Sequence, residues 1–438
     1  MSIGSKVTSK RLELDRMLVE SYNREYDDVA SNRREMSAED RKWLEAIEKG
    51  VRTVGGSYEV PWPLHDNHGP LPETRDIALR RMHRLRKKLV KDGNYAKQCS
   101  AFMTERQQKG YAEQVTTASS GNVWYIPHFG VQHPDKPDKV RVVFDCASKV
   151  EGISLNDLLL QGPDMMKSLL GVLVKFRGGL FAYTGDINTM FYQVRVPEHQ
   201  RDYLRFFWWE NSLDEEPKEW RMAVHLFGSC SSSSIANFVL KQTASDFWNE
   251  FSEGVRFTVA NNFYVDDCLR AEDRKDALLV NLSEVKELCK KGGFTLTKFS
   301  SPCVEVMSSI PRDWYSRGTS ELIDGSESHK TKALGVQWDL ATDELGVRAE
   351  LFSVPRTKRD LLSAIASIYD PLGILAPVLI EDRVIMQDLC RLKISWDMEL
   401  DSDTTDRIKA WAKKLSQTSG ISVPRSLKVI PWDSATLV

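Results

Sequence analysis

The chain has 438 residues, of which 41% are hydrophobic and 28% charged, and its formal net charge at pH 7 is −2. This composition is typical of a globular protein with about two to four domains, and no run approaches the roughly 18 apolar residues that a membrane span needs. Residues 1–6 lack the apolar segment of a signal peptide, and the 7 cysteines are scattered without a Cys-x-x-Cys pair, which favours free thiols in a reducing compartment over disulfides or a zinc ribbon.

The first 50 residues have helical patterns. An amphipathic pattern over Leu12–Tyr26 predicts one helix, and Ser37 with Asp40 three residues later predicts the start of a second helix that ends near Gly50. We interpret residues 1–50 as a leader or linker of a longer polyprotein. Glycine and proline are frequent over residues 51–72, which predicts short strands and loops there.

A basic helix is predicted at Leu79–Lys91, a stretch that holds seven cations and no acid. Its apolar residues Met82, Leu85 and Leu89 fall on one helical face. A helix docked by that face would offer a positive surface to phosphates, although the net charge of the whole chain argues against nucleic acid. A merely solvated basic face is equally consistent with the pattern. A further helix is predicted at Tyr95–Gln107.

Two β-rich runs, Val123–Pro127 and Lys139–Phe144, are predicted as strands joined by a proline-rich turn. His128 and His133 have zinc-finger spacing, but no cysteine pair precedes them, so we interpret them as loop residues. The following patterns predict two helices with four strands between them, at 165–176, 180–183, 192–196, 203–209, 219–225 and 235–248. Four serines, residues 231–234, precede the second of these helices, and Ser233 is a candidate cap for it.

Two adjacent carboxylates, Asp266 and Asp267, interrupt an apolar run. The run favours a strand, whereas an Asp pair is disfavoured in one, and a tight hairpin turn at the pair reconciles the two; the strand-favouring residues are Phe257, Val259, Phe263, Val265 and Leu269. Two such close charges repel unless a proton or a cation intervenes, and Mg²⁺ or Mn²⁺ suits oxygen ligands. A solvated surface hairpin is the better interpretation of an Asp pair alone, but Asp186, expected where an upstream strand ends, favours a shared site.

Downstream of the Asp pair, a helix at Asp273–Lys290 and a strand at Gly292–Lys298 are predicted. Thr331–Leu340 has the pattern of a hairpin with Gly335 at its turn. From Pro355 onward the pattern is helical, with predicted helices at 361–369, 378–392 and 403–415.

Three motifs now point to one family: Tyr-Val-Asp-Asp at 264–267, Asp-Ile-x-x-Met-Phe-x-Gln at 186–193, and Val-His-Leu-Phe-Gly at 224–228, which is followed by Ser231–Ser234. They resemble the reverse transcriptase motifs of retroelements, and from about Met36 the chain is most similar to polyproteins of BEL/Pao-type LTR retrotransposons. It departs from them at Ser233, where related elements have proline.

The resemblance implies an α+β fold of the right-hand polymerase type. It places fingers and the start of the palm at 51–180, the palm with the catalytic hairpin and primer grip at 181–353, and a helical thumb with the start of a connection at 354–438. It also leads us to expect an RNase H domain beyond the last residue of this chain.

The resemblance further implies site residues. Asp186 and Asp266 would hold two divalent cations, Mg²⁺ or Mn²⁺, with Asp267 in support. The implied nucleotide-binding residues are Arg141, Phe191, Phe227, Gly228 and Lys298, and the implied primer or template contacts are Gln193, Tyr264, Gly335, Trp338, Arg84 and Lys87. Four of these have a structural alternative: a salt bridge to Asp145 or Asp138 for Arg141, a core position for Phe191 and Trp338, and an ordinary strand-edge lysine for Lys298.

The implied function is RNA-directed and DNA-directed DNA synthesis. The implied partners are an RNA template, a DNA primer–template duplex, deoxynucleoside triphosphates and other parts of a retrotransposon polyprotein, and the implied location is cytoplasmic, in a virus-like particle, or nuclear. A catalytically defective or co-opted nucleic-acid-binding protein is the alternative, which Ser233 favours. An aspartic peptidase is excluded, because neither Asp-Thr-Gly nor Asp-Ser-Gly occurs.

Overall fold

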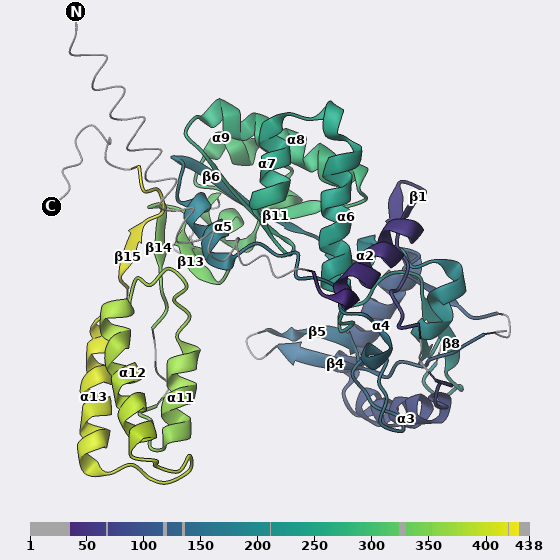
Figure 1. Ribbon diagram of the computed structural model, residues 1–438, viewed down its shortest axis with the longest axis horizontal. Coiled ribbons are helices and arrows are strands. Elements are labelled where there is room, and N and C mark those ends of the chain that lie inside the picture. Colours follow the sequence, from purple (N-terminus) through teal and green to yellow (C-terminus); the bar gives the residue numbers. More distant parts are fainter. Residues whose placement is uncertain are drawn as a thin grey trace, which may run out of the picture.

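The protein is a mixed helix-and-sheet structure whose elements form three groups in space (Figure 1). The computed structural model describes residues 36–66, 69–116, 121–133, 136–210, 212–323, 330–349, 351, 353–418 and 420–428. The helix predicted at Leu12–Tyr26 lies outside these residues. None of the helices in the described ranges is both long and apolar enough to cross a membrane.

The first group is built on a four-stranded antiparallel sheet with the order β11–β6–β10–β9, referred to below as the central sheet. Its strands are β6 (Phe181–Ile187), β9 (Phe263–Tyr264), β10 (Asp267–Glu272) and β11 (Leu296–Ser300). Its helices are α5 (Leu169–Phe176), α6 (Ser232–Asp246), α7 (Glu253–Asn261), α8 (Lys275–Lys291), α9 (Val304–Ser308) and α10 (Arg317–Ile323).

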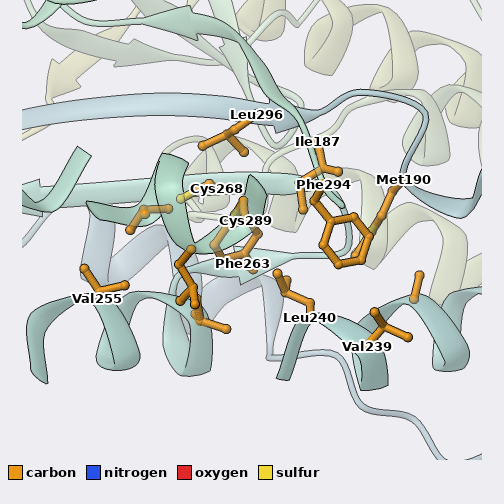
Figure 2. Close-up of a cluster of buried hydrophobic side chains, with 14 of the residues drawn as sticks. Ile187, Met190, Val239, Leu240, Val255, Phe263, Cys268, Cys289, Phe294 and Leu296 are labelled. Carbon is orange, nitrogen blue, oxygen red and sulfur yellow. The ribbon is translucent and has the colours of Figure 1, made fainter. Parts of the chain in front are cut away.

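The two faces of the central sheet bury different sets of side chains, because neighbours along a strand point in opposite directions. Tyr183 and Ile187 of β6 belong to the larger core, which includes residues of α6, α7 and α8. Figure 2 shows Ile187, Phe263, Cys268 and Leu296 gathered in this core. Ala182 lies in a second core with residues of α5. Asp186 is four residues further along the same strand and therefore points to the same face, on the α5 side of the sheet.

The second group holds two small sheets, β3–β8–β7 and the β4–β5 hairpin, packed with α3 and α4 around a core rich in aromatic residues. Its elements are α3 (Arg75–Lys91), α4 (Gly93–Gln108), β3 (Ala112–Gln114), β4 (His128–His133), β5 (Lys136–Phe144), β7 (Arg205–Trp208) and β8 (Lys218–Met222). As predicted, α3 buries Met82, Leu85 and Leu89 and leaves its cations on the opposite face.

The segment that we interpreted as a leader begins with a helix that belongs to the core. Helix α2 (Ala38–Gly50) starts at Ser37, whose side chain accepts a hydrogen bond from the Asp40 N–H, as the sequence predicts. Its Trp43 and Ile47 are fully buried in the same core as the central sheet, and a short hairpin, β1 (Arg52–Val54) and β2 (Ser57–Glu59), follows it. The interpretation of residues 38–50 as a linker was therefore wrong.

The third group contains a second four-stranded sheet and a bundle of three helices, α11–α13. The sheet, referred to below as the hairpin sheet, has the order β12–β13–β14–β15. Its strands are β12 (Lys330–Ala333), β13 (Val336–Asp339), β14 (Glu344–Gly346) and β15 (Ser422–Pro424), and the bundle consists of α11 (Lys358–Ser367), α12 (Ala376–Arg391) and α13 (Ser402–Gln417). Since the bundle lies between β14 and β15 in the chain, it is an insertion into this sheet. The three predicted C-terminal helices and the predicted hairpin are confirmed.

Several predicted strands are wrong. Phe257 and Val259 lie in α7, because Val255, Thr258 and Val259 recur at helical spacing and form a buried stripe. The run Val123–Pro127 makes only an isolated bridge to Arg205, and the strand that pairs with β5 is β4 instead, so His128 and His133 are strand residues and not loop residues. Residues 192–196 likewise form only isolated bridges, through Arg195.

Two predicted helix starts were misplaced. The helix predicted from Met165 begins at Leu169, after Ser168 caps it by accepting a hydrogen bond from the Gly171 N–H. Helix α6 begins at Ser232, so Ser233 lies inside the helix and does not cap it. Ser231 occupies the N-cap position, and its side chain makes no capping hydrogen bond.

Candidate active site

The two adjacent aspartates lie at a tight turn between β9 and β10, as the sequence predicts. Val265, which precedes them, has φ 56°, a left-handed conformation that is costly for a β-branched residue. The main-chain carbonyl of Asp266 accepts a hydrogen bond of 2.8 Å from the N–H of Ile187. The turn is therefore fixed to the end of β6 by main-chain contacts.

Asp186 and Asp267 are direct partners across the antiparallel β6–β10 pair. Such partners have Cα atoms about 4.5–5.5 Å apart and project their side chains to the same face of the sheet. Asp186 lies at the end of β6, one residue before the strand ends, as predicted, although the strand itself extends further than the predicted 180–183. The structure thus brings together three carboxylates that are separated by about 80 residues in the chain.

The three carboxylates repel one another. The pKa of Asp267 is raised to about 7, first by burial and then by the negative charges of Asp266 and Asp186. The pKa of Asp266 is raised by burial and by Asp186, and it is lowered by Lys298 and Arg141. These shifts indicate that the site holds more negative charge than its own cations neutralise.

Lys298 supplies the nearest cation. Its Nζ lies 2.7 Å from Oδ1 of Asp186, and its side chain is 61% exposed. The residue has φ 52° and lies where the pairing of β11 with β6 becomes irregular. The preceding residue, Thr297, is the direct partner of Asp186. In a regular strand Lys298 would point to the opposite face of the sheet from Thr297, so it is the bulge that turns Lys298 toward the aspartates.

The three aspartates offer only oxygen donors, which suits a hard divalent cation such as Mg²⁺ or Mn²⁺. Burial and repulsion of two of them mean that a bound cation would stabilise the site. As placed, the side chains in the described ranges do not form a group of three or more His, Cys, Asp or Glu residues around one ion position. The residues therefore fit a divalent cation by donor chemistry, and Lys298, already paired with Asp186, would compete with it for that carboxylate.

A small aromatic cluster lies beside this site. The rings of Phe191 and Phe227 are 4.4 Å apart, and the guanidinium carbon of Arg141 lies 5.5 Å from the Phe227 ring. Gly228 has φ 104°, and a Cβ on it would lie 2.6 Å from the carbonyl oxygen of Phe144. Four of the predicted nucleotide-binding residues are thus in one place, and the charge of Arg141 is near enough to lower the pKa of Asp266.

The predicted alternative of a salt bridge from Arg141 to Asp145 does not occur, because Asp145 pairs with Arg81 of α3 at 2.9 Å. The side chain of Asp138, the other alternative partner, lies outside the described residues. Arg141 itself is exposed on β5. Its guanidinium is therefore available for an anion beside Phe227 and Asp266.

Two predicted primer contacts, Gln193 and Tyr264, lie near the site, and the side chain of Gln193 already makes hydrogen bonds within the protein. The side-chain amide of Gln193 donates to Thr189 Oγ1 at 3.0 Å, to the Asn188 carbonyl at 3.1 Å and to the Tyr111 hydroxyl at 3.1 Å. It therefore holds the short 3-10 helix Met190–Gln193, which carries Phe191. Tyr264 is half-buried at the end of β9, directly opposite Asp267.

The predicted primer-grip residues differ in their surroundings. Gly335 lies at the β12–β13 turn with φ 84°, where a Cβ would come within 2.6 Å of the Tyr369 ring, and it lines a cavity of about 430 Å³ with Lys330, Lys332 and Arg348. Trp338 is fully buried, edge-on to Phe176, and its indole N–H donates to Asp343. Its side chain is a core residue, so the prediction that it contacts nucleic acid was wrong.

Arg84 and Lys87 are exposed on α3. Figure 1 shows α3 at the far end of the second group, away from the central sheet. The structure does not bring these two cations together with the aspartates.

Sequence reasoning missed the residues that support the aromatic cluster from behind. The side chain of Asn156 donates to the Gly228 carbonyl at 3.1 Å and accepts from the Cys230 N–H at 3.0 Å. The indole N–H of Trp43 donates to Ser231 Oγ at 2.9 Å. The spacing of Trp43 and Ile47 in an otherwise polar helix was the signal that could have indicated a buried face.

Comparison with known proteins gives a partial family match. Residues 357–438 are similar to a family described as "Pao retrotransposon-like RNaseH-like domain". This supports the predicted resemblance to a retrotransposon polyprotein. It also places a family named for RNase H over α11–α13, whereas the sequence analysis expected that domain beyond the chain. No curated protein matches the chain.

Three solved structures of a foamy viral protease–reverse transcriptase resemble the fold. One is a complex of a dRH form with double-stranded DNA (TM-score 0.46, 13% identity), one a complex with an RNA/DNA hybrid (0.45, 12%), and one a complex with double-stranded DNA (0.49, 13%). Each covers 90% of this chain, which in turn spans 60%, 46% and 72% of theirs.

Proposed function

We propose that the protein is an RNA-directed and DNA-directed DNA polymerase, the reverse transcriptase of a Pao-type retrotransposon. The observation that carries this proposal is the placement of Asp186 opposite Asp267, with Asp266 beside them. Half-buried carboxylates that repel one another weaken a fold unless a partner neutralises them. Their convergence is therefore better explained by a function that uses cations than by stability.

In this proposal the three groups have the roles of a right-hand polymerase. The central sheet is the palm, the group with the β4–β5 hairpin is the fingers, and the bundle α11–α13 is the thumb. We assign the bundle to nucleic-acid grip and not to nuclease activity, because its described part is three packed helices. The proposed domain boundaries stay at 51–180, 181–353 and 354–438, with α2 joined to the palm.

Asp186, Asp266 and Asp267 would hold two Mg²⁺ or Mn²⁺ ions. When bound, such ions lower the pKa of the primer 3′-hydroxyl and neutralise charge on the leaving pyrophosphate. Before binding, Lys298 orients Asp186 by its 2.7 Å contact. Released from Asp186, the exposed Lys298 ammonium would be a candidate to donate a proton to the leaving pyrophosphate.

The remaining residues position the nucleotide. Arg141 is proposed to bind the triphosphate by paired N–H groups, which its exposure beside Asp266 permits. Phe191, held against Phe227, would lie under the sugar and exclude a 2′-hydroxyl. Gly228 lets the main chain approach the Phe144 carbonyl closely, where any side chain would collide with that oxygen.

The proposed partners are an RNA template, a primer–template duplex, deoxynucleoside triphosphates and other segments of a retrotransposon polyprotein. The foamy viral structures were solved as complexes with double-stranded DNA and with an RNA/DNA hybrid, ligands of the same classes. The proposed location is a cytoplasmic virus-like particle, or the nucleus.

Primer extension tests the proposal. On a homopolymer RNA template with an annealed DNA primer and Mg²⁺ or Mn²⁺, we expect the wild type to extend the primer and Asp266→Asn to lose at least a hundredfold in rate. Asp273→Asn is a matched control, because this exposed acid pairs with Lys428 away from the three aspartates. No extension by the wild type, or equal extension by Asp266→Asn, would refute the polymerase.

The second candidate is a nucleic-acid-binding protein without polymerase activity. The contact of Lys298 with Asp186 favours it, because that ion pair neutralises one aspartate without a metal. The same experiment separates the two candidates. Tight primer–template binding that divalent cations do not alter, together with no extension, would support the second.

A further inference from the structure

Helix α2 lies beside the N-terminal end of α6 (Figure 1), and Trp43 contacts this end with both its ring and its indole N–H. Trp43 is fully buried. Its ring is edge-on to Phe238 of α6 at 6.2 Å, and a Cβ on Gly162 would lie only 2.5 Å from it. The indole therefore packs between Gly162, where a side chain would collide with it, and Phe238 of α6.

The polar end of the same ring fixes a hydroxyl. The indole N–H donates to Ser231 Oγ at 2.9 Å, and Ser231, at the N-cap position of α6, makes no capping bond with its side chain. A serine at this position ordinarily accepts from the first turn of its own helix. Here the Ser231 backbone is helical (φ −88°, ψ −16°) and not in the extended conformation of a capping residue, and its hydroxyl accepts from Trp43, which ties α6 to α2.

Ser231 is three residues from Gly228, and the chain between them is held on both sides. Asn156 binds the Gly228 carbonyl and the Cys230 N–H from one side, and Trp43 binds Ser231 from the other. Ser234 also donates to the Pro163 carbonyl at 3.1 Å, in the loop that carries Gly162. Phe227, which contacts Phe191 and Arg141, begins this segment.

We propose that Trp43 is a positioning residue for the nucleotide site, and that α2 is therefore needed for full polymerase activity. The inference rests on the proposed function, because it concerns how that site is held. Trp43 touches no reacting group. It acts through Ser231 on the segment 228–231, which sets the position of Phe227 and the close approach of Gly228 to Phe144.

Two conservative variants remove the contact from opposite ends. Trp43→Phe keeps a ring against Phe238 and Gly162 but lacks the N–H, and Ser231→Ala lacks the acceptor. We expect each to raise KM for the deoxynucleotide about three- to tenfold, the worth of one hydrogen bond. We expect kcat and the primer–template Kd to stay within about twofold, and the double variant to be no worse than the more impaired single variant.

Trp411→Phe is the matched control, because Trp411 is also fully buried but its indole N–H has no partner among the described residues. It should leave KM unchanged. The proposal is overturned if neither single variant changes KM, if the two effects add in the double variant, or if Trp411→Phe raises KM as much.

Hydrogen exchange gives a readout that does not need activity. Amides of residues 228–240 should exchange faster in Trp43→Phe and Ser231→Ala than in the wild type, while those of α12 should not change. If the wild type extends no primer, the proposed function fails, and the exchange result alone decides whether Trp43 holds this segment. Unchanged exchange in both variants overturns the positioning role.

Discussion

Asp382 is a buried acid with no side-chain partner among the described residues, and its replacement should change how the bundle α11–α13 responds to pH. It lies on α12 in the apolar stripe between Leu379 and Ile385 and is 0% exposed. No side chain in the described part of the chain donates a hydrogen bond to either carboxylate oxygen. Burial raises its pKa from 3.8 to about 6, although the backbone N–H and the charge of the neighbouring Arg383 lower it.

The magnitude follows from linkage. An acid with a pKa of about 6 in the folded state and 3.8 in the unfolded state binds its proton more tightly when folded. Its contribution is fully present below pH 3.8 and is lost as the pH rises through 6. At about 1.36 kcal/mol per pKa unit, the bundle loses roughly 2.4 kcal/mol between pH 4 and pH 7 through this group.

Asp382→Asn removes the titration while keeping the shape of the protonated acid. We expect the variant to gain about 2.4 kcal/mol on the wild type from pH 4 to pH 7, a change of about 60-fold in the ratio of their local opening constants. Hydrogen exchange of α12 and α13 amides, corrected for intrinsic rates, measures that ratio. Any fixed cost of the new amide cancels in the comparison, and so do the other carboxylates.

The result that would refute this reasoning is a ratio that stays constant within about threefold from pH 4 to pH 7. It would mean that Asp382 ionises alike in the folded and unfolded states. Exchange in α8 serves as the internal control, since α8 belongs to another core.

Two further predictions concern main-chain geometry and a buried ion pair. Gly228→Ala places a methyl group about where the Phe144 carbonyl lies, at a φ that disfavours any side chain, so primer extension should fall by at least tenfold while primer–template binding is retained. Arg425→Met leaves Asp343 without its buried partner and should destabilise the attachment of β15 by about 3–5 kcal/mol, seen as faster proteolysis after residue 418 with α8 unaffected.

The sequence predicts elements well where local and tertiary preferences agree. Asp266 and Asp267 interrupt an apolar run, and the only conformation that suits both is the turn that the structure shows. The helices of the bundle have a helical apolar pattern, start signals and no competing strand preference, and α11 begins with a capping box at Thr357. The residues of the β9–β10 hairpin and of the bundle α11–α13 were predictable for this reason.

Other features depend on partners distant in the sequence, which no local pattern contains. Val259 favours a strand by residue type, but its burial against the larger core keeps it in α7. The residues around Trp338 in the sequence do not distinguish a side chain that contacts nucleic acid from one that packs in the core against Phe176. Trp43 binds Ser231, 188 residues away, and only the fold reveals this contact between α2 and the start of α6.

Contacts made by Arg425, just after β15, attach the bundle α11–α13 to the rest of the structure. Arg425, fully buried just after β15, donates to both oxygens of Asp343 and to the carbonyls of Phe176, Gly179 and Leu180. These partners join the hairpin sheet to the C-terminal end of α5 and to the residues that lead into β6, the strand of Asp186. Since the bundle leaves the hairpin sheet after β14 and returns at β15, both of its ends are fixed to the base of the proposed palm. Under the proposed function, two attachment points would limit the movement of the bundle relative to the central sheet and so help to keep a bound duplex aligned with the aspartates.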